Sequence, residues 1–574
     1  MTRNETNDVR IGDRFISLRM VSIGIFVAVL SFYLYTMQPS LAWGDGAKLQ
    51  LEAVSGESFI FSDFPDEMFA HDPYPFAKLG VAAWDHPLYV VIGHSLVNLL
   101  PGVHALWLVN LLSAVFGAAA VLVFFRLLFE GTGHLWAAIS AATMLAVSHT
   151  FWWHSSTPEV YTLFAFLLLM TIYFYAHFER SEDFRYLIAS AFVLGLSTAN
   201  HIMSFLAVPA IVFYWWLNRR QVTSQTLRQM SLRRVLYLTI AFLAGISLLL
   251  IQAIRMLRVF PLSEIMGPVV GSVFISQLLS TSFADLITSL ITYAGFTLLQ
   301  FGPVGLALGI YGLIFARRNN LHLWGKMIAF YTVFAIFGVL YRVSDQFAFF
   351  LTAHIFFAIA IGLGAAQLAE TWKEARQHLV HVAVLASVLT MPFVYRSIPG
   401  LAASLNIDDA TFGIPQIGTG LRNGLAYYLD PYKRGDYNPY NFGLETVEAL
   451  PEDALVVAQW FPDTDEYLAL HYLTWVEGMR PDVQVAGWTP VDPFSFDSEI
   501  IASEIRENID NRPIFLASLD VDFYQADYLM QNHCIVPETN LYRVYPFGPN
   551  SSDAAAYECL SDPDLLVYTF SNPN

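Results

Sequence analysis

Long apolar runs recur along most of the chain and are separated by short polar connections. A helix that crosses the hydrocarbon core of a bilayer needs roughly 20 apolar residues, and eleven segments approach that length. They lie near Met20–Gln38, His104–Arg126, His134–Ser148, Val160–His177, Tyr186–Thr198, Ile202–Leu217, Val235–Met256, Leu286–Phe315, Trp324–Tyr341, Phe347–Ala369 and Leu379–Tyr395. This pattern predicts a polytopic α-helical membrane protein with about eleven transmembrane helices.

Arginine and lysine gather in alternate connections between these runs. The basic connections fall on the same side of the predicted bundle as the N-terminus, and the positive-inside rule makes that side cytoplasmic. Their basic residues are Arg180, Arg185, Arg219, Arg220, Arg228, Arg233, Arg234, Arg317, Arg318, Lys326, Lys373 and Arg376. We therefore expect a multi-pass protein of the cell (inner) membrane, with residues 1–19 cytoplasmic and residues 20–396 forming the transmembrane domain.

The first exterior loop, residues 39–103, contains a short apolar stretch of its own. The segment "PLYVVIGHSLVNLL", residues 87–100, is too short to span comfortably and includes His94 and Asn98. We interpret it as an amphipathic helix that lies at the outer interface. The alternative is a twelfth span, which would reverse the orientation of everything that follows.

The composition changes near Glu445, after a linker over residues 397–444. The segments "DALVVAQW", "DVQVAGW" and "PIFLASL" are typical of buried strands, while "DTDEYLALHYLTWVEG" and "EIIASEIRENI" have helical periodicity. With an odd number of spans, this region lies outside, so residues 445–574 are predicted to form an exterior α/β domain. The only two cysteines, Cys534 and Cys559, both fall here, either as a disulfide or as two buried free thiols.

Composition and charge agree with this organisation. Of the 574 residues, 55% are hydrophobic and only 14% are charged, which is far from the average of soluble domains. The formal net charge of -18 arises mainly from acids between Asp45 and Asp85 and after Asn406. Because no continuous basic stripe is present to neutralise phosphates, nucleic-acid binding is not expected.

Acidic residues at the outer ends of the predicted spans are the main candidates for chemistry. Asp45 follows "WG" after the first span, Asp85 precedes the interfacial helix, and Glu159 follows Pro158 at the start of the fourth span. A carboxylate close to lipid is costly to keep charged unless it is paired or wet, so its presence there favours a function. The alternative for each is an ordinary solvated acid.

Histidines and one arginine lie at the same predicted depth. His149 and His154 belong to "SHTFWWHSSTPEVYTL", and His201 lies in "GLSTANHIMSF", where it is either structural or functional. In "YRVSDQFAFF", Arg342 is a candidate for a lipid phosphate. The alternative is that Arg342 pairs with Asp345 and caps the following helix. Together these residues predict a cavity that accepts a substrate with a lipid tail and a polar head.

Several motifs in order along the chain resemble the protein O-mannosyltransferase-like family of membrane glycosyltransferases, which belongs to the C-type glycosyltransferase superfamily. They are "YLYTMQPSLAWGDGAKL", "DHPLYVVIGHSL", "WLVNLLSAVFGAAAVLVFF", "SHTFWWHSSTPEVYTL", "GLSTANHIMS" and "SDQFAFFLTAHIFFAIAIGLG". The resemblance implies a C-type glycosyltransferase fold and an essential acid in the first exterior loop. It also implies inverting transfer of a sugar from a polyprenyl-phosphate donor to a protein hydroxyl, glycan or lipid acceptor.

The first-loop motif departs from the family pattern, which is approximately Trp-Gly-Asp-Ser-Gly-Glu-Leu. Trp43, Gly44, Asp45 and Leu49 match, whereas Lys48 replaces the glutamate. The resemblance makes Asp45 the expected general base. Asp85, Glu159 or Glu52 would supply a second acid, and Lys48, His86, His201 and Arg342 would stabilise the leaving phosphate.

Two questions stay open at the level of sequence. The acids around Asp45 could hold a divalent cation through oxygen ligands, but their spacing is not specific to any metal. The loss of the glutamate at Lys48 also favours an alternative function, a non-catalytic glycolipid-binding or transport protein on the same scaffold.

Overall fold

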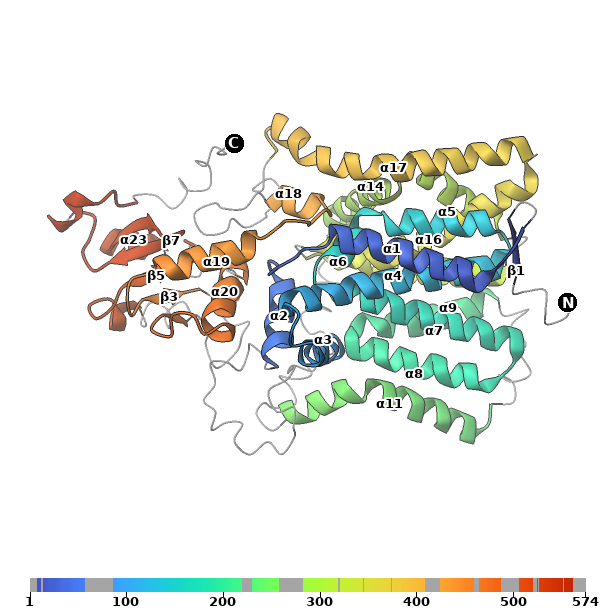
Figure 1. Cartoon of the computed structure of the whole chain (residues 1–574), viewed down its shortest axis with the longest axis horizontal. Helices are drawn as coiled ribbons and strands as arrows, with labels where there is room; N and C mark the ends of the chain where they lie inside the picture. Colours follow the sequence, from blue (N-terminus) through green and yellow to red (C-terminus); the bar gives the residue numbers. More distant parts are fainter. Residues whose placement is uncertain are drawn as a thin grey trace.

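The computed structural model describes residues 8–560 apart from 12–13, 57–85, 219–229, 258–281, 318–320, 344, 373, 408–423, 459–463, 487–504, 520–523, 525 and 551. It consists of a bundle of long helices and a smaller domain with a β-sheet at one end of that bundle (Figure 1). The N-terminal hairpin of β1 (Asp8–Ile11) and β2 (Arg14–Ser17) lies at the opposite end. We call the two ends of the bundle the sheet end and the N-terminal end.

All eleven segments expected to span the membrane are helical. They are α1 (Leu18–Thr36), α4 (Ala105–Thr132), α5 (Leu135–Ala146), α7 (Tyr161–Ser181), α8 (Phe184–Asn200), η3 (Ile202–Leu206) with α9 (Ala207–Leu217), α11 (Leu232–Met256), α14 (Phe283–Phe315), α15 (Leu321–Leu340), α16 (Gln346–Thr371) and α17 (Glu374–Ser404). In the described part of the chain, eight helices are long and apolar enough to cross a membrane. A bent pair, α5 with α6 (His149–Ser156), would add a ninth, while α8 and α9 are shorter.

The last helix of the bundle extends well beyond the span expected from the sequence. The last span was expected to end at Tyr395, but α17 continues to Ser404 with Pro392 and Pro399 inside it. A proline inside a helix removes one backbone hydrogen bond and its ring crowds the carbonyl group four residues before, so it usually bends or ends a helix. Helix α17 nevertheless continues through both prolines. The linker expected over residues 397–444 therefore begins with helix, and it also contains α18 (Gly424–Leu429) and α19 (Asn438–Ala449).

The centre of the bundle is formed by α4, α7 and α16, whereas α1, α11 and α17 leave most of their apolar surface uncovered. Close packing in the centre depends on small residues. A Cβ atom on Gly312 of α14 would lie 1.9 Å from the carbonyl oxygen of Ala360 on α16. The exposed apolar faces of the outer helices are those that a bilayer would cover.

At the sheet end, two short helices follow the first span. These are α2 (Asp45–Ser55) and α3 (Pro87–Leu99). Figure 1 views α3 nearly end-on while the long helices run across the view, so α3 lies across the end of the bundle. It is the helix predicted at the interface, and its place relative to a bilayer stays a prediction.

The sheet has the strand order β4-β3-β5-β7-β6. The three predicted strands are β3 (Leu455–Val457), β4 (Gln484–Ala486) and β5 (Ile514–Leu516), which pair in parallel. An unpredicted antiparallel hairpin, β6 (Cys534–Glu538) and β7 (Leu541–Tyr545), completes the sheet. A disulfide joins Cys534 to Cys559, with Cα atoms 5.1 Å apart.

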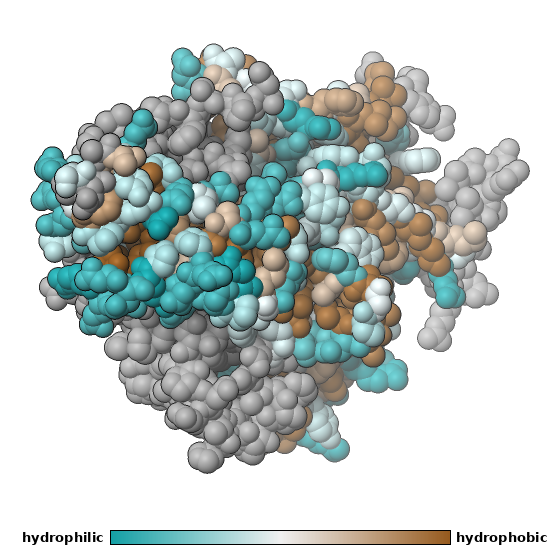
Figure 2. Space-filling view, turned by 60° about the vertical axis from the view of Figure 1, so that its left-hand side comes forward, coloured by the Kyte–Doolittle hydropathy of each residue, from teal (hydrophilic) through white to brown (hydrophobic). Residues whose placement is uncertain are grey.

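The sheet domain packs directly on the first loop. Leu41, Trp43 and Leu51 belong to the same apolar cluster as Tyr467 and Leu468 of α20 (Thr464–His471), which continues into the π-helical turn η5 (Tyr472–Val476). The hydrophilic surface gathers over the sheet domain, and hydrophobic surface is more extensive over the bundle (Figure 2). Helix α2 is therefore enclosed between the two parts of the molecule.

Candidate active site

Asp45 is the first residue of α2, and glycines on both sides of it fix its position. Gly44 has φ 61° and ψ -142°, a conformation that residues with a side chain rarely adopt. At Gly46, a Cβ atom would lie 2.9 Å from the Cβ of Ala42 and 3.1 Å from the carbonyl oxygen of Pro158. The N-terminus of α2 therefore rests against the turn that carries Glu159. Asp45 itself is exposed, and the helix dipole favours its negative charge.

Glu159 lies in the turn between α6 and α7, and its backbone is held on both sides. Its N–H donates to the hydroxyl oxygen of Ser113 on α4 over 2.9 Å, and that hydroxyl is 3.1 Å from the carbonyl oxygen of Glu159. The hydroxyl of Tyr89 on α3 lies 3.0 Å from the same Ser113 oxygen. Residues from α3 and α4 thus support the turn, which explains why the carboxylate has a defined place next to α2.

A third carboxylate, Asp345, approaches from the residue before α16. Burial and then the negative charge of Asp45 raise the pKa of Asp345 to about 7. Burial, followed by the charges of Asp45 and Asp345, raises the pKa of Glu159 well above its ordinary value. Three acids from distant parts of the sequence therefore share one site. Because the three acids repel one another, the half-buried Glu159 and Asp345 retain protons more readily than isolated carboxylates.

Aromatic and imidazole rings line this group of acids. The ring of Tyr161, the first residue of α7, lies 4.6 Å from that of His154 and 5.3 Å from that of His201. The ring of His201 is 5.1 Å from that of His86, whose Nδ1 is 2.7 Å from the carbonyl oxygen of Asn200. The two histidines predicted to bind phosphate, His86 and His201, are therefore neighbours beside the acids.

The other candidates have different surroundings. Lys48 and Glu52 are buried on α2, with exposed fractions of 6% and 0%. Arg342 is half exposed and forms an ion pair of 2.5 Å with Asp285 at the start of α14. The alternative in which Arg342 pairs with Asp345 is therefore not seen, and the Asp345 side chain makes no cap bond to α16. Asp85 lies outside the described residues. His149, noted in the same motif as His154, is 2.9 Å through Nε2 from the carbonyl oxygen of Tyr428.

Asp345 was not among the predicted catalytic residues, because its proximity to Arg342 in the sequence indicated an ion pair. The available signal was its position at the end of a span, at the same depth as Asp45 and Glu159. Lys433 was missed entirely. It is buried, and its ammonium lies 4.0 Å from the centre of the Tyr427 ring and contacts the carbonyl oxygen of Tyr427.

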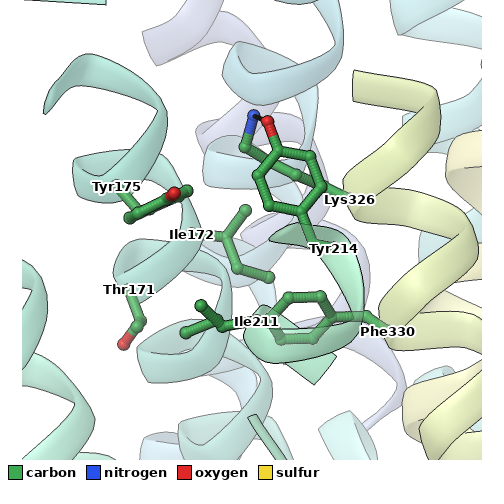
Figure 3. A pocket seen from close by; sticks show the side chains of 7 residues that line it. All are labelled: Thr171, Ile172, Tyr175, Ile211, Tyr214, Lys326 and Phe330. Atoms are coloured by element: carbon green, nitrogen blue, oxygen red, sulfur yellow. Dashed lines mark hydrogen bonds between the residues drawn. The ribbon is translucent and has the colours of Figure 1, made fainter. Parts of the chain in front are cut away.

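A metal site has no direct support in the described ranges, where no group of three or more His, Cys, Asp or Glu residues is arranged to hold an ion. A separate small pocket lies between α7, α9 and α15 (Figure 3). Its lining is mostly apolar, with Tyr175, Tyr214 and Lys326 at its polar edge. Tyr175 is fourteen residues beyond Tyr161 on α7, about 21 Å along the helix, so this pocket is separate from the acidic site.

Comparison with solved structures identifies the class of fold. The chain superposes on ArnT from Cupriavidus metallidurans bound to undecaprenyl phosphate with a TM-score of 0.56 and 12% sequence identity, covering 92% of this chain and 97% of that one. The chain thus combines a bundle of apolar helices with an attached sheet domain, as this neighbour does. This is the fold of the C-type glycosyltransferases. At this identity the likeness concerns the fold alone.

Sequence comparison then identifies the relatives. Residues 77–225 match the family model "Protein O-mannosyl-transferase TMEM260 N-terminal domain". The chain is 24% identical to the mouse (Mus musculus) protein O-mannosyl-transferase TMEM260 over 81% of its length and 62% of that protein's. The chain is also 20% identical to protein O-mannosyl-transferase tmem260 from Dictyostelium discoideum, over 88% of this chain and 64% of that one. The resemblance to the protein O-mannosyltransferase-like family is confirmed, and the chain spans less than two thirds of these relatives.

Proposed function

We propose that this protein is a membrane glycosyltransferase that moves a sugar from a polyprenyl-phosphate donor to an acceptor hydroxyl, with inversion at the sugar carbon. The observation that carries the proposal is the convergence of Asp45, Glu159 and Asp345 at the sheet end of the bundle. The names of its relatives, protein O-mannosyl-transferases, support mannose as the first sugar to test and a protein hydroxyl as the acceptor.

In the proposed reaction, the carboxylate of Asp45 accepts the proton of the acceptor hydroxyl. The hydroxyl oxygen forms a bond with the anomeric carbon from the side opposite the phosphate. The bond between that carbon and the phosphate oxygen breaks, and the lipid phosphate leaves with the electron pair. Asp45 suits the role of base because it is the most accessible of the three acids and begins a helix.

Glu159 and Asp345 complement this role. Their raised pKa values mean that Glu159 and Asp345 hold protons at a higher pH than isolated carboxylates do. A protonated carboxyl can donate a hydrogen bond to a sugar hydroxyl or to the phosphate, and it does not repel the anionic donor. Retaining two neutral acids next to one charged base is therefore a reasonable arrangement for an anionic substrate.

His86 and His201 are the best-placed candidates for the leaving phosphate, because their rings adjoin each other and Tyr161. Lys48 and Arg342 remain candidates, but each would have to change its surroundings, since Lys48 is buried and Arg342 is bound to Asp285. Asp85 directly precedes His86 in the sequence and stays a candidate for a second acid.

The orientation that fits this reaction places the sheet end on the outer face of the membrane. The arginines of the basic connections follow helices that run away from the acidic site. Helix α7 begins at Tyr161 and ends at Ser181, beside Arg180, and α14 begins next to the ion pair of Arg342 with Asp285 and ends at Phe315, before Arg317. The sheet domain covers α2, so we propose that it helps to select or present the acceptor.

The test is transfer by the purified full chain from a panel of polyprenyl-phosphate sugars, beginning with mannose. Asp45→Asn should lose about 10²- to 10⁴-fold in turnover, the usual contribution of a general base, and should still bind the donor. Asp183→Asn, at the opposite end on α8, serves as the control. If neither wild type nor Asp45→Asn transfers any sugar while both bind the donor, the alternative of a glycolipid-binding or transport protein is favoured.

A further inference from the structure

We propose that the sheet end carries a second lipid-binding site, for the phosphate of an anionic phospholipid headgroup, where α1, α17 and residues 430–434 meet. The site consists of Arg396, Arg434, Tyr35 and Tyr432, with Asp430 at its edge, and we call it the arginine junction. The proposal is independent of the proposed transfer reaction, because none of these residues belongs to the acidic site.

The two arginines are held by stacking on tyrosines from a different segment. The Cζ atom of Arg434 lies 4.3 Å from the centre of the Tyr35 ring at the end of α1, and that of Arg396 on α17 lies 4.9 Å from the Tyr432 ring. The Tyr35 and Tyr432 rings are themselves 6.3 Å apart and meet edge to face. Stacking of this kind fixes a guanidinium in place and leaves its N–H groups available to an acceptor.

A backbone contact fastens the segment to the bundle. The N–H of Lys433 donates to the carbonyl oxygen of Thr36, the last residue of α1, over 2.8 Å. Because Arg434 is the next residue, its backbone is also fixed relative to Tyr35. The junction is therefore a built contact between three segments and not a chance approach of long side chains.

The charges at the junction are not balanced. The nearest carboxylate oxygen to Arg396 belongs to Asp430 and is 3.6 Å away, beyond ordinary hydrogen-bond length. Within the described ranges, Arg434 has no ion pair. Lys433 does not add to the exposed charge, because its ammonium is buried against Tyr427. In the described part of the chain, Asp430 is the one carboxylate within 4 Å of either guanidinium group, and it lies beside Arg396. An anion bound between the two arginines would offset the remaining positive charge.

The place of the junction indicates a lipid and not a soluble anion. Helices α1 and α17 are among the least covered spans of the bundle. Tyr35 is 58% exposed, and Phe393, one turn before Arg396 on α17, is 73% exposed. An apolar face of this kind requires acyl chains around it, and arginine and tyrosine at its end then fall at headgroup depth.

The position is also unusual for arginine in this molecule. The sequence places most basic residues in the connections at the N-terminal end, whereas the loops of the sheet end are acidic. General attraction of anionic lipid would act at the N-terminal end, so two stacked arginines at the sheet end indicate a specific contact. Guanidinium groups bind phosphate oxygens in pairs of parallel hydrogen bonds, which fits a phosphodiester.

The experiment uses the full chain in an uncharged detergent, with dioctanoyl phosphatidylglycerol as the probe and dioctanoyl phosphatidylcholine as its neutral counterpart. Native mass spectrometry counts the bound lipid at each concentration. Each arginine near a headgroup contributes about fivefold in affinity, so Arg396→Gln with Arg434→Gln should weaken phosphatidylglycerol binding about 25-fold. Phosphatidylcholine has the same phosphodiester, but its choline cation cancels the charge and is repelled by the guanidinium groups. It should therefore bind more weakly than phosphatidylglycerol and lose less affinity in the double variant.

Arg543→Gln is the matched control, because Arg543 also stacks on a tyrosine, at 4.6 Å from Tyr545, and has one carboxylate partner, but lies in the sheet. Equal thermal midpoints of the variants without lipid would show that they fold. A double Arg→Lys variant should bind with intermediate affinity, since it keeps the charge and loses the paired geometry. Equal binding of both lipids by wild type, or unchanged binding by the double Gln variant, overturns the proposal, as does displacement of the lipid by millimolar inorganic phosphate.

Discussion

Asp345→Asn is expected to make the folded protein more stable at pH 8, although it removes a charged residue. In the folded chain, burial and the neighbouring charge of Asp45 raise the pKa of Asp345 from 3.8 to about 7. Between these values the unfolded chain releases the proton and the folded chain keeps it. The stability of the folded state therefore falls as pH rises from about 4 to about 7, and the loss is complete above that range.

The size of the effect follows from the two pKa values. Each tenfold difference in proton affinity corresponds to about 1.4 kcal/mol, so Asp345 costs the folded state about 4 kcal/mol at pH 8 and about 1 kcal/mol at pH 4.5. Asparagine has no proton to retain and is close in shape to the protonated acid. We expect Asp345→Asn to recover about 2–4 kcal/mol at pH 8.

Thermal unfolding of the purified protein in detergent measures this difference at the two pH values. The gain in midpoint should be clear at pH 8 and small at pH 4.5. Asp183→Asn is the control, because the expected change in its unfolding midpoint has the opposite sign. The hydrogen bond from Arg185 lowers the pKa of Asp183, so the Asp183 carboxylate stabilises the folded state at higher pH and this stabilisation is lost as the pH falls. A midpoint for Asp345→Asn that is unchanged at pH 8, or raised equally at both pH values, would refute the reasoning.

Two further predictions concern packing and a buried ion pair. Gly46→Val should lower the rate of sugar transfer about 100-fold, because the added side chain moves α2 away from the turn of Glu159. Gly102→Val is the control in the same assay. No atom lies within 4 Å of a Cβ added there, so the transfer rate should not change. Glu179→Gln should destabilise the protein by about 3–5 kcal/mol in thermal or denaturant unfolding, because it leaves the buried ammonium of Lys326 without its carboxylate. An equal loss from Arg185→Gln, which breaks an exposed pair, would contradict that explanation.

The helices of the bundle could be predicted because each is encoded locally. A run of apolar residues is sufficient to define a span, and all eleven predicted runs are helices. The hairpin of β6 and β7 was not predicted, since its strands combine polar and apolar residues without a strong local pattern. The extent of α17 was not predicted either, because a proline such as Pro399 usually marks the end of a helix.

The site could be predicted only in part, because it depends on distant contacts. Asp45 and Glu159 were recognisable as acids at the ends of spans, but their proximity requires Gly46 to approach Pro158. Asp345 is 300 residues beyond Asp45 in the sequence, and only the packing of α16 brings it to the same place. Residues close in the sequence can also be misjudged: Arg342 lies three residues before Asp345, yet its partner is Asp285 on α14.

Lys48 illustrates how the structure changes the interpretation of a substitution. Read from the sequence, a lysine in place of the family glutamate indicates a lost catalytic acid. In the structure, the side chain of Lys48 is buried on α2, one turn after Gly44, whose added Cβ would lie 3.6 Å from Asp465 of α20. A buried ammonium needs polar or anionic partners, so the lysine is held within the packing around α2, the helix that lies against α20.

The carboxylates that the proposed reaction requires come from elsewhere. Glu159 and Asp345 enter the site from the turns before α7 and α16 and place two acids next to Asp45. The change at position 48 therefore does not by itself remove acid–base chemistry from the site. Restoring the glutamate with Lys48→Glu would instead bury a negative charge beside the buried Glu52, and the resulting repulsion should separate α2 from the sheet domain before it could benefit catalysis.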